Sequence, residues 1–187
     1  DGVVDYIVLG LENYVFSNGV TLAITFSMNE LSGSSYNRLI GNWENAGIGL
    51  HVLSSGKIRF DVHDGSIYQN VNSENPINLG ETYTAIGTYD GKSIKLFLNS
   101  ELVKNLDIEL KISASVKPFS LAANLNTTIH EDFANVNVEN VQIYNRAISE
   151  EEVSLVSEGK VANSEGLLRY VDFTNKSYED NEIIPEE

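Results

Sequence analysis

Hydrophobic and polar residues alternate with a period of two over much of this chain. The clearest example runs from Leu22 to Met28, where Leu, Ile, Phe and Met alternate with Ala, Thr and Ser. Because successive side chains of a strand point to opposite faces, this pattern predicts a strand with one face in a core. Comparable segments predict further strands at 82–89, 94–98, 119–123, 137–144 and 167–173.

Two alternating segments, 48–52 and 58–62, are separated by the turn residues 54–56, which end in Gly56. Two strands joined by so short a turn predict a β-hairpin. Pairing in register commits Ile58, Phe60 and Val62 to the core and brings polar residues of both strands together on the opposite face. These polar residues are His51, Arg59, Asp61 and His63.

The segment 137–144 changes parity part of the way along. Val138 falls on one parity, whereas Val141 and Ile143 fall on the other. One extra residue near 139–140 would return all three side chains to the same face, so we expect a β-bulge there.

A single helical signal interrupts the strand pattern. Residues 149–152 read Ser-Glu-Glu-Glu, which is a capping box, and apolar residues at 153, 155 and 156 follow. In a capping box the serine side chain accepts from the third helical N–H, and the glutamate reaches back to the serine N–H. We predict a helix of about two turns over 149–157 that ends near Gly159. Many strands with one short helix indicate an all-β sandwich or barrel.

Composition and net charge narrow the choice of binding partner. The 187 residues contain no cysteine and carry a net charge of −15, from 12 basic and 27 acidic residues. An acidic surface repels phosphate backbones and anionic membranes, so we expect no nucleic-acid partner and no membrane insertion. A neutral glycan, a cation or a basic protein fits better. We expect one domain over residues 1–175 and a loose acidic tail over 176–187.

Three segments carry a family resemblance. They are DGVVDYI at 1–7, TYTAIGTYDG at 82–91 and VENVQIYNRAISEEE at 138–152. In this order they resemble the bacterial laminin-G-like domains of the concanavalin A-like superfamily. The resemblance implies an all-β, two-sheet antiparallel jelly-roll sandwich with one short helix near 149–157. It also implies packing roles for Tyr89 and Tyr144.

The same resemblance implies a metal site. Members of the family often hold one structural calcium ion near the opening Asp-Gly segment and a closing Asp-Asp pair, which is Glu139-Asn140 here. The resemblance therefore assigns Asp1, Asp5, Glu139 and Asn140 as candidate calcium ligands. Carboxylate and amide oxygens suit this hard cation.

Catalysis is not expected. The nearest match to the alternating carboxylates of related glycosidases is the face formed by Asn105, Asp107 and Glu109. Retaining glycosidases need two carboxyl groups about 5–5.5 Å apart, one of them nucleophilic. Asn105 stands at the nucleophile position, and an amide cannot attack. We interpret these residues as a solvated strand face.

A sugar site needs an aromatic surface and planar polar groups. We predict a ligand-binding face built by His51, Arg59, Asp61 and His63, edged by Tyr36 in the loop 34–38 and by Trp43, with Tyr68 and Asn70 nearby. Two histidines would make binding sensitive to pH near about 6.5. The sequence thus predicts a non-catalytic carbohydrate-binding or adhesion module of a bacterial surface or secreted protein. The alternative is a structural or protein-interaction domain of a phage virion or cell-surface assembly, so the location is extracellular, on a cell surface or on a virion. The partner is a glycan or a surface protein.

Overall fold

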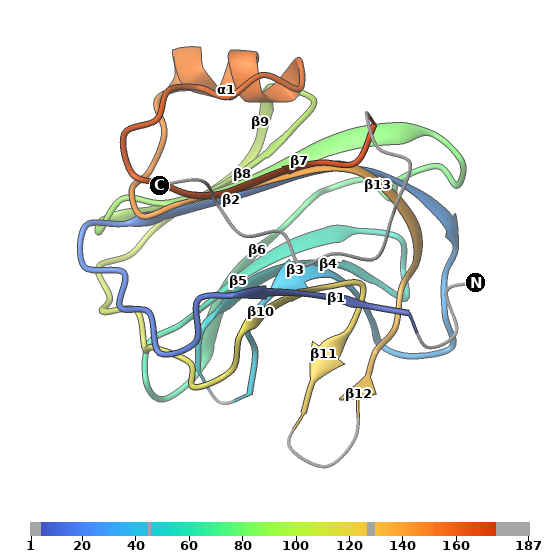
Figure 1. Ribbon diagram of the computed structural model, residues 1–187, viewed down its shortest axis with the longest axis horizontal. Coiled ribbons are helices and arrows are strands. Elements are labelled where there is room, and N and C mark those ends of the chain that lie inside the picture. The colour runs from blue at the N-terminus through green and yellow to red at the C-terminus, as the bar shows by residue number, and fades with distance from the viewer. Residues whose placement is uncertain (1–4, 45, 127–129, 175–187) are drawn as a thin grey trace.

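The computed structural model describes residues 5–44, 46–126 and 130–174. Two six-stranded antiparallel sheets face one another across a hydrophobic core (Figure 1). In spatial order the first sheet contains β1 (Ile7–Gly10), β10 (Phe119–Leu121), β3 (Tyr36–Gly41), β4 (Ile48–Leu53), β5 (Ile58–His63) and β6 (Tyr68–Asn72). The second contains β14 (Leu167–Asp172), β13 (Asn135–Tyr144), β2 (Val20–Glu30), β7 (Thr82–Tyr89), β8 (Ser93–Leu98) and β9 (Glu101–Asp107).

Two smaller elements lie outside the sandwich. The helix α1 (Glu150–Ser157) covers the outer side of the second sheet (Figure 1). The hairpin of β11 (Asn124–Leu125) and β12 (His130–Glu131) projects away from the first sheet on the side opposite the core. The predicted all-β sandwich with one short helix is confirmed. The predicted tail, 176–187, lies outside the described residues, and the domain boundary at 175 stays a prediction.

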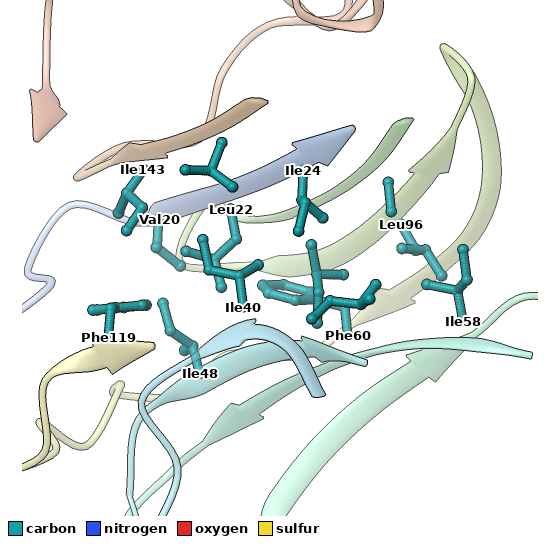
Figure 2. Close-up of a cluster of buried hydrophobic side chains, with 14 of the residues drawn as sticks. Val20, Leu22, Ile24, Ile40, Ile48, Ile58, Phe60, Leu96, Phe119 and Ile143 are labelled. Carbon is teal, nitrogen blue, oxygen red and sulfur yellow. The ribbon is translucent and has the colours of Figure 1, made fainter. Parts of the chain in front are cut away.

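The alternating residues meet in the core as the pattern predicted. Leu22 and Ile24 on β2 face Ile58 and Phe60 on β5, and all four side chains are fully buried (Figure 2). Gly87 on β7 leaves room for the Phe60 ring, because a Cβ atom there would lie 2.3 Å from it. Close packing between the sheets fixes their separation and leaves the outer faces available for other roles.

The local predictions from sequence are also confirmed. β4 and β5 form the expected antiparallel hairpin, with His51 opposite Arg59. The register of β13 against β2 shifts between Val138 and Asn140, where the bulge was expected. Ser149 caps α1, and both hydrogen bonds of the capping box are present. Tyr89 and Tyr144 are buried packing residues as well.

The prediction of a loop over 34–38 was wrong in part, because β3 begins at Tyr36. Alternation gave no signal here, since β3 is covered on both faces from Asn37 to Gly41. A strand buried on both sides shows no period of two. The consequence is functional, because β3 carries two side chains of the candidate site.

Candidate functional site

A pocket of about 490 Å³ opens on the outer face of the first sheet, away from the core. Its floor comes from β3, β5 and β6, and one wall is the β11–β12 hairpin. The sheet contributes Tyr36, Arg38, Arg59, Asp61 and Tyr68, and the β3–β4 loop contributes Trp43. The volume lies in the range of about 300–1,000 Å³ that is typical of small-molecule sites.

A pair of glycines places Trp43 in this pocket. Gly41 and Gly49 are register partners on β3 and β4. A Cβ atom at Gly41 or Gly49 would lie 2.6 Å or 2.1 Å, respectively, from Cζ2 of Trp43. The indole therefore rests directly on the backbone of the two strands, on the outer face and not in the core. It is 3% exposed.

Arg38 lies between two aromatic rings. Its guanidinium carbon is 4.5 Å from the centre of the Tyr36 ring and 4.4 Å from that of Trp43. Its Nε and Nη2 atoms both lie 3.2 Å from Oδ2 of Asp132, just after β12. Cation–π stacking and a charge-assisted pair together fix the planar group. Arg38 thus joins the floor of the pocket to its hairpin wall.

His51 and Asp61 form a buried pair beneath this layer. His51 is fully buried, and its Nδ1 lies 3.4 Å from Oδ2 of Asp61 and 3.3 Å from Nη1 of Arg38. Burial lowers the pKa of His51 well below its usual value, and Arg38 and Arg59 lower it further. Burial raises the pKa of Asp61 to about 7 against the opposing effect of the two arginines. Below pH 7 the pair is therefore mostly neutral, not an ion pair.

Polar atoms without partners gather at this pocket. Among the described residues, five buried side-chain nitrogen or oxygen atoms have no hydrogen-bond partner, and four of them belong to residues in the pocket lining or directly beneath it. They are Nε1 of Trp43, Nε2 of His51, Oδ1 of Asp61 and Oδ1 of Asn124. An unmet buried polar group costs about 1–3 kcal/mol, so such groups usually mark a functional or hydrated site.

The hairpin wall is acidic. The Asn124 Nδ2 donates to Oε1 of Glu44 at 2.7 Å and to Oε1 of Glu131 at 3.2 Å. Asn124, Glu131 and Asp132 were not predicted from the sequence. The strands β11 and β12 have two residues each, which is too short for any alternation. The available signal was the run of Asn and acidic residues around 124–132.

The structure brings four of the six predicted ligand-binding residues into the pocket lining: Tyr36, Trp43, Arg59 and Asp61. The prediction that His51 belongs to an outward patch needs correction. His51 faces away from the core, but the side chains stacked above it leave it with no exposed surface. His63 is 5% exposed, its Nδ1 accepts from the N–H of Gly65, and it does not line the pocket. Because the pKa of His51 is lowered, Asp61 replaces it as the group that titrates near neutrality.

The predicted calcium ligands are divided between the sheets. Asp1 lies outside the described residues. Asp5 precedes β1 of the first sheet, whereas Glu139 and Asn140 lie on β13 and line a different pocket beside α1, to which Asp5 does not contribute. No three His, Asp or Glu side chains come together as metal ligands in the described ranges. The calcium site assigned to these four residues stays a prediction.

The carboxylate strand is solvated, as interpreted from sequence. Asn105 and Asp107 lie on the edge strand β9, and both are exposed, as is Glu109. The Asn105 amide donates to Asp107 at 2.8 Å. None of the three lines the pocket. In the described chain α1 is the sole helix, and its eight residues are too few to cross a membrane.

The fold and the recessed outer-face pocket define a lectin-like β-sandwich. The chain belongs to the concanavalin A-like lectin/glucanases superfamily, because a laminin G family model with that description matches residues 1–154. No curated protein matches the chain in sequence.

Solved structures agree on the fold. A Bacteroides ovatus protein described as carbohydrate-binding is similar with a TM-score of 0.73 and 16% identity, over 94% of this chain and 51% of that one. The CBM40 module of the Ruminococcus gnavus IT-sialidase, bound to α2,3-sialyllactose, has a TM-score of 0.64 and 17% sequence identity. The match covers 82% of this chain and 97% of that one. The receptor-binding domain of botulinum neurotoxin C/D mosaic serotype has a TM-score of 0.65 and 18% sequence identity. The match covers 83% of this chain and 40% of that one. The chain thus spans about half or less of two of these structures.

Proposed function

We propose that this domain binds a glycan in the pocket between β3, β5, β6 and the β11–β12 hairpin. The observation that carries the proposal is the set of three buried, unpartnered polar atoms on residues that line this pocket, Trp43, Asp61 and Asn124. Sugar hydroxyls both donate and accept, so one ligand can satisfy an indole N–H together with a carboxyl oxygen. The family and the carbohydrate-binding relatives support the same class of ligand.

The groups that line the pocket suit a sugar held edge-on. Asp61 and Arg59 offer planar hydrogen-bonding groups on one rigid strand. Tyr68 holds its hydroxyl against the carbonyl oxygen of Ala46 at 2.8 Å, which leaves its ring to shape the pocket. Preformed side chains cost little ordering entropy on binding. Such a site gives weak affinity, with a Kd of about 1 μM to 1 mM.

The charges favour a neutral glycan. Three carboxylates (Glu44, Glu131 and Asp132) face two arginines, and Arg38 is already paired with Asp132. Asp61 adds a further negative charge as pH rises above about 7. The whole chain carries −15. A sialylated or sulfated ligand would meet net repulsion at this pocket. A neutral oligosaccharide avoids that cost.

We also propose that the domain is non-catalytic and belongs to a surface or secreted bacterial protein. Support comes from Asn105 at the nucleophile position and from the exposure of the neighbouring carboxylates. The alternative, an interaction domain of a phage virion or surface assembly, predicts a protein ligand at a different face.

A glycan microarray followed by titration tests the proposal. Trp43 is the single tryptophan of the chain and lines the pocket, so its fluorescence reports binding. Arg59→Ala should weaken the best neutral glycan by about fivefold or more, the equivalent of roughly 1 kcal/mol for one lost polar contact. Lys104→Ala, on the exposed edge strand β9, is the matched control. No hit, or equal loss in both variants, rejects the pocket.

A further inference from the structure

We infer that a second ligand site lies beside α1 and takes a primary ammonium group, the lysine side chain of a protein partner. The site is a pocket of about 580 Å³, lined by the C-terminal half of α1 and by the outer face of the second sheet. The helix lies on that side of the sandwich (Figure 1), whereas the glycan pocket opens on the first sheet. The second site therefore does not depend on glycan binding.

The β-bulge of β13 aims Asn140 at this pocket. Val138 packs against the core, so strict alternation would turn residue 140 toward the core as well. The register shifts between Val138 and Asn140, and Asn140 pairs instead with Thr25 of the pocket lining. The end of α1 lies close to it, because a Cβ atom at Gly159 would be 3.7 Å from Nδ2 of Asn140. Bulges commonly re-aim a side chain in this way at functional sites.

Two buried polar groups of this lining lack partners. Asn140 is 6% exposed, and among the described residues its side-chain amide has no hydrogen-bond partner. The Oγ atom of Ser157, the last residue of α1, is buried and is also unpartnered. The nearby hydroxyls of Thr25 and Thr84 hydrogen-bond to each other at 2.9 Å instead. Unmet buried polar groups lower stability, so two in one pocket point to a ligand.

The rest of the lining indicates which ligand. It contains two carboxylates, Glu139 and Glu158, and no basic or aromatic residue. Glu158 is paired with Lys160 at 2.6 Å. In the described part of the chain, Glu139 forms no salt bridge and accepts one long hydrogen bond of 3.4 Å, from Thr82. The pocket therefore has negative charge to offset but no ring on which a sugar could stack.

An ammonium group matches these features together. It donates three hydrogen bonds and accepts none. The lining offers three acceptors: the Asn140 amide oxygen and the Ser157 hydroxyl, which are buried, and the exposed Glu139 carboxylate. Hydrogen bonds from a charged donor are stronger than those between neutral groups. The chain's net charge of −15 also attracts a basic partner.

Peptide titration followed by NMR tests the site. The probe is a blocked Gly-Lys-Gly peptide, and the same peptide with glutamine in place of lysine is the neutral comparison. We expect only the lysine peptide to shift the side-chain amide signals of Asn140. Ser157→Ala should weaken its binding by about tenfold, because a hydrogen bond to a charged group is lost. Glu139→Gln should weaken it by about threefold, since solvent screens an exposed charge.

Glu109→Gln is the matched control. It removes an equal charge from an exposed residue outside the lining, so its affinity should equal that of the parent. Circular dichroism verifies that every variant is folded. Unchanged Asn140 signals, equal shifts with the glutamine peptide, parent affinity in Ser157→Ala, or equal losses in Glu109→Gln and Glu139→Gln would overturn the inference. No glycan is present, so the result is independent of the proposed function.

Discussion

At the scale of single residues, the site contains buried polar groups whose surroundings lower the stability of the fold. Asp61 is a buried carboxyl whose pKa is raised to about 7, and His51 is a buried imidazole kept neutral. Trp43 lies on two glycines with its N–H unpartnered. Functional sites commonly retain such stability defects, because the same groups are needed for binding.

Asp61→Asn should change how stability depends on pH. The pKa of Asp61 rises from 3.8 unfolded to about 7 folded, so its ionisation destabilises the fold as pH rises between these values. Between pH 4 and pH 8 the parent should lose on the order of 4 kcal/mol of unfolding free energy relative to Asp61→Asn. Urea denaturation at several pH values measures this difference.

Asp64→Asn is the control with the opposite sign. Backbone N–H groups of Ile67 and Ser66 lower the pKa of the exposed Asp64 carboxyl. Its contribution to stability is therefore lost as pH falls, and the parent should lose stability relative to Asp64→Asn toward acid. A difference between parent and Asp61→Asn that does not vary with pH would contradict the buried, titrating carboxyl.

Gly49→Ala should displace the indole. The new Cβ would lie 2.1 Å from Cζ2 of Trp43, which no rotamer adjustment of alanine can relieve. Overpacking of this kind costs about 1–3 kcal/mol. Unfolding free energy should fall and Trp43 emission should shift to the red. At Gly33 an added Cβ meets nothing within 4 Å, so Gly33→Ala should change neither the unfolding free energy nor the Trp43 emission. Equal effects in the two variants would contradict the packing of Trp43 on Gly49.

At the scale of elements, alternation predicted the strands that have one face in the core and one in a different environment. The β4–β5 hairpin, the β13 bulge and α1 all follow from local pattern and capping chemistry. The same rule could not find β3, which is covered on both faces, or the short strands β11 and β12. The sheet half of the site was therefore predicted, and the hairpin wall was not. Its side chains meet the sheet only through tertiary contacts such as Arg38 with Asp132.

Ser149→Ala tests whether the capping box holds α1 in place. The Ser149 side chain accepts from the N–H of Glu152, and Glu152 accepts from the N–H of Ser149. Losing a serine cap costs about 1 kcal/mol. Ser154→Ala, on the exposed side of the same helix, should cost less, because alanine favours helix interiors. Equal losses in urea denaturation would show that the cap contributes nothing.

At the scale of the whole molecule, the two sheets have different outer faces. The second sheet carries α1, whereas the β11–β12 hairpin lies beside the first sheet (Figure 1). The pocket is on that first sheet. One packed core holds both in position, with Phe60 and Ile58 anchoring the strand whose other face presents Arg59 and Asp61. Because the core is rigid, the side chains that line the pocket are held in position before a ligand binds.

The central claim is that ligand binds on the outer face of the first sheet. Mapping backbone amide shifts by NMR during titration with the best neutral glycan from the array tests it most directly. The account predicts shifts confined to β3, β5, β6, the β3–β4 loop and the β11–β12 hairpin. In Arg59→Ala the same shifts should need at least about fivefold more glycan. Shifts centred on α1 and the outer face of β2, β7 and β8 would contradict it.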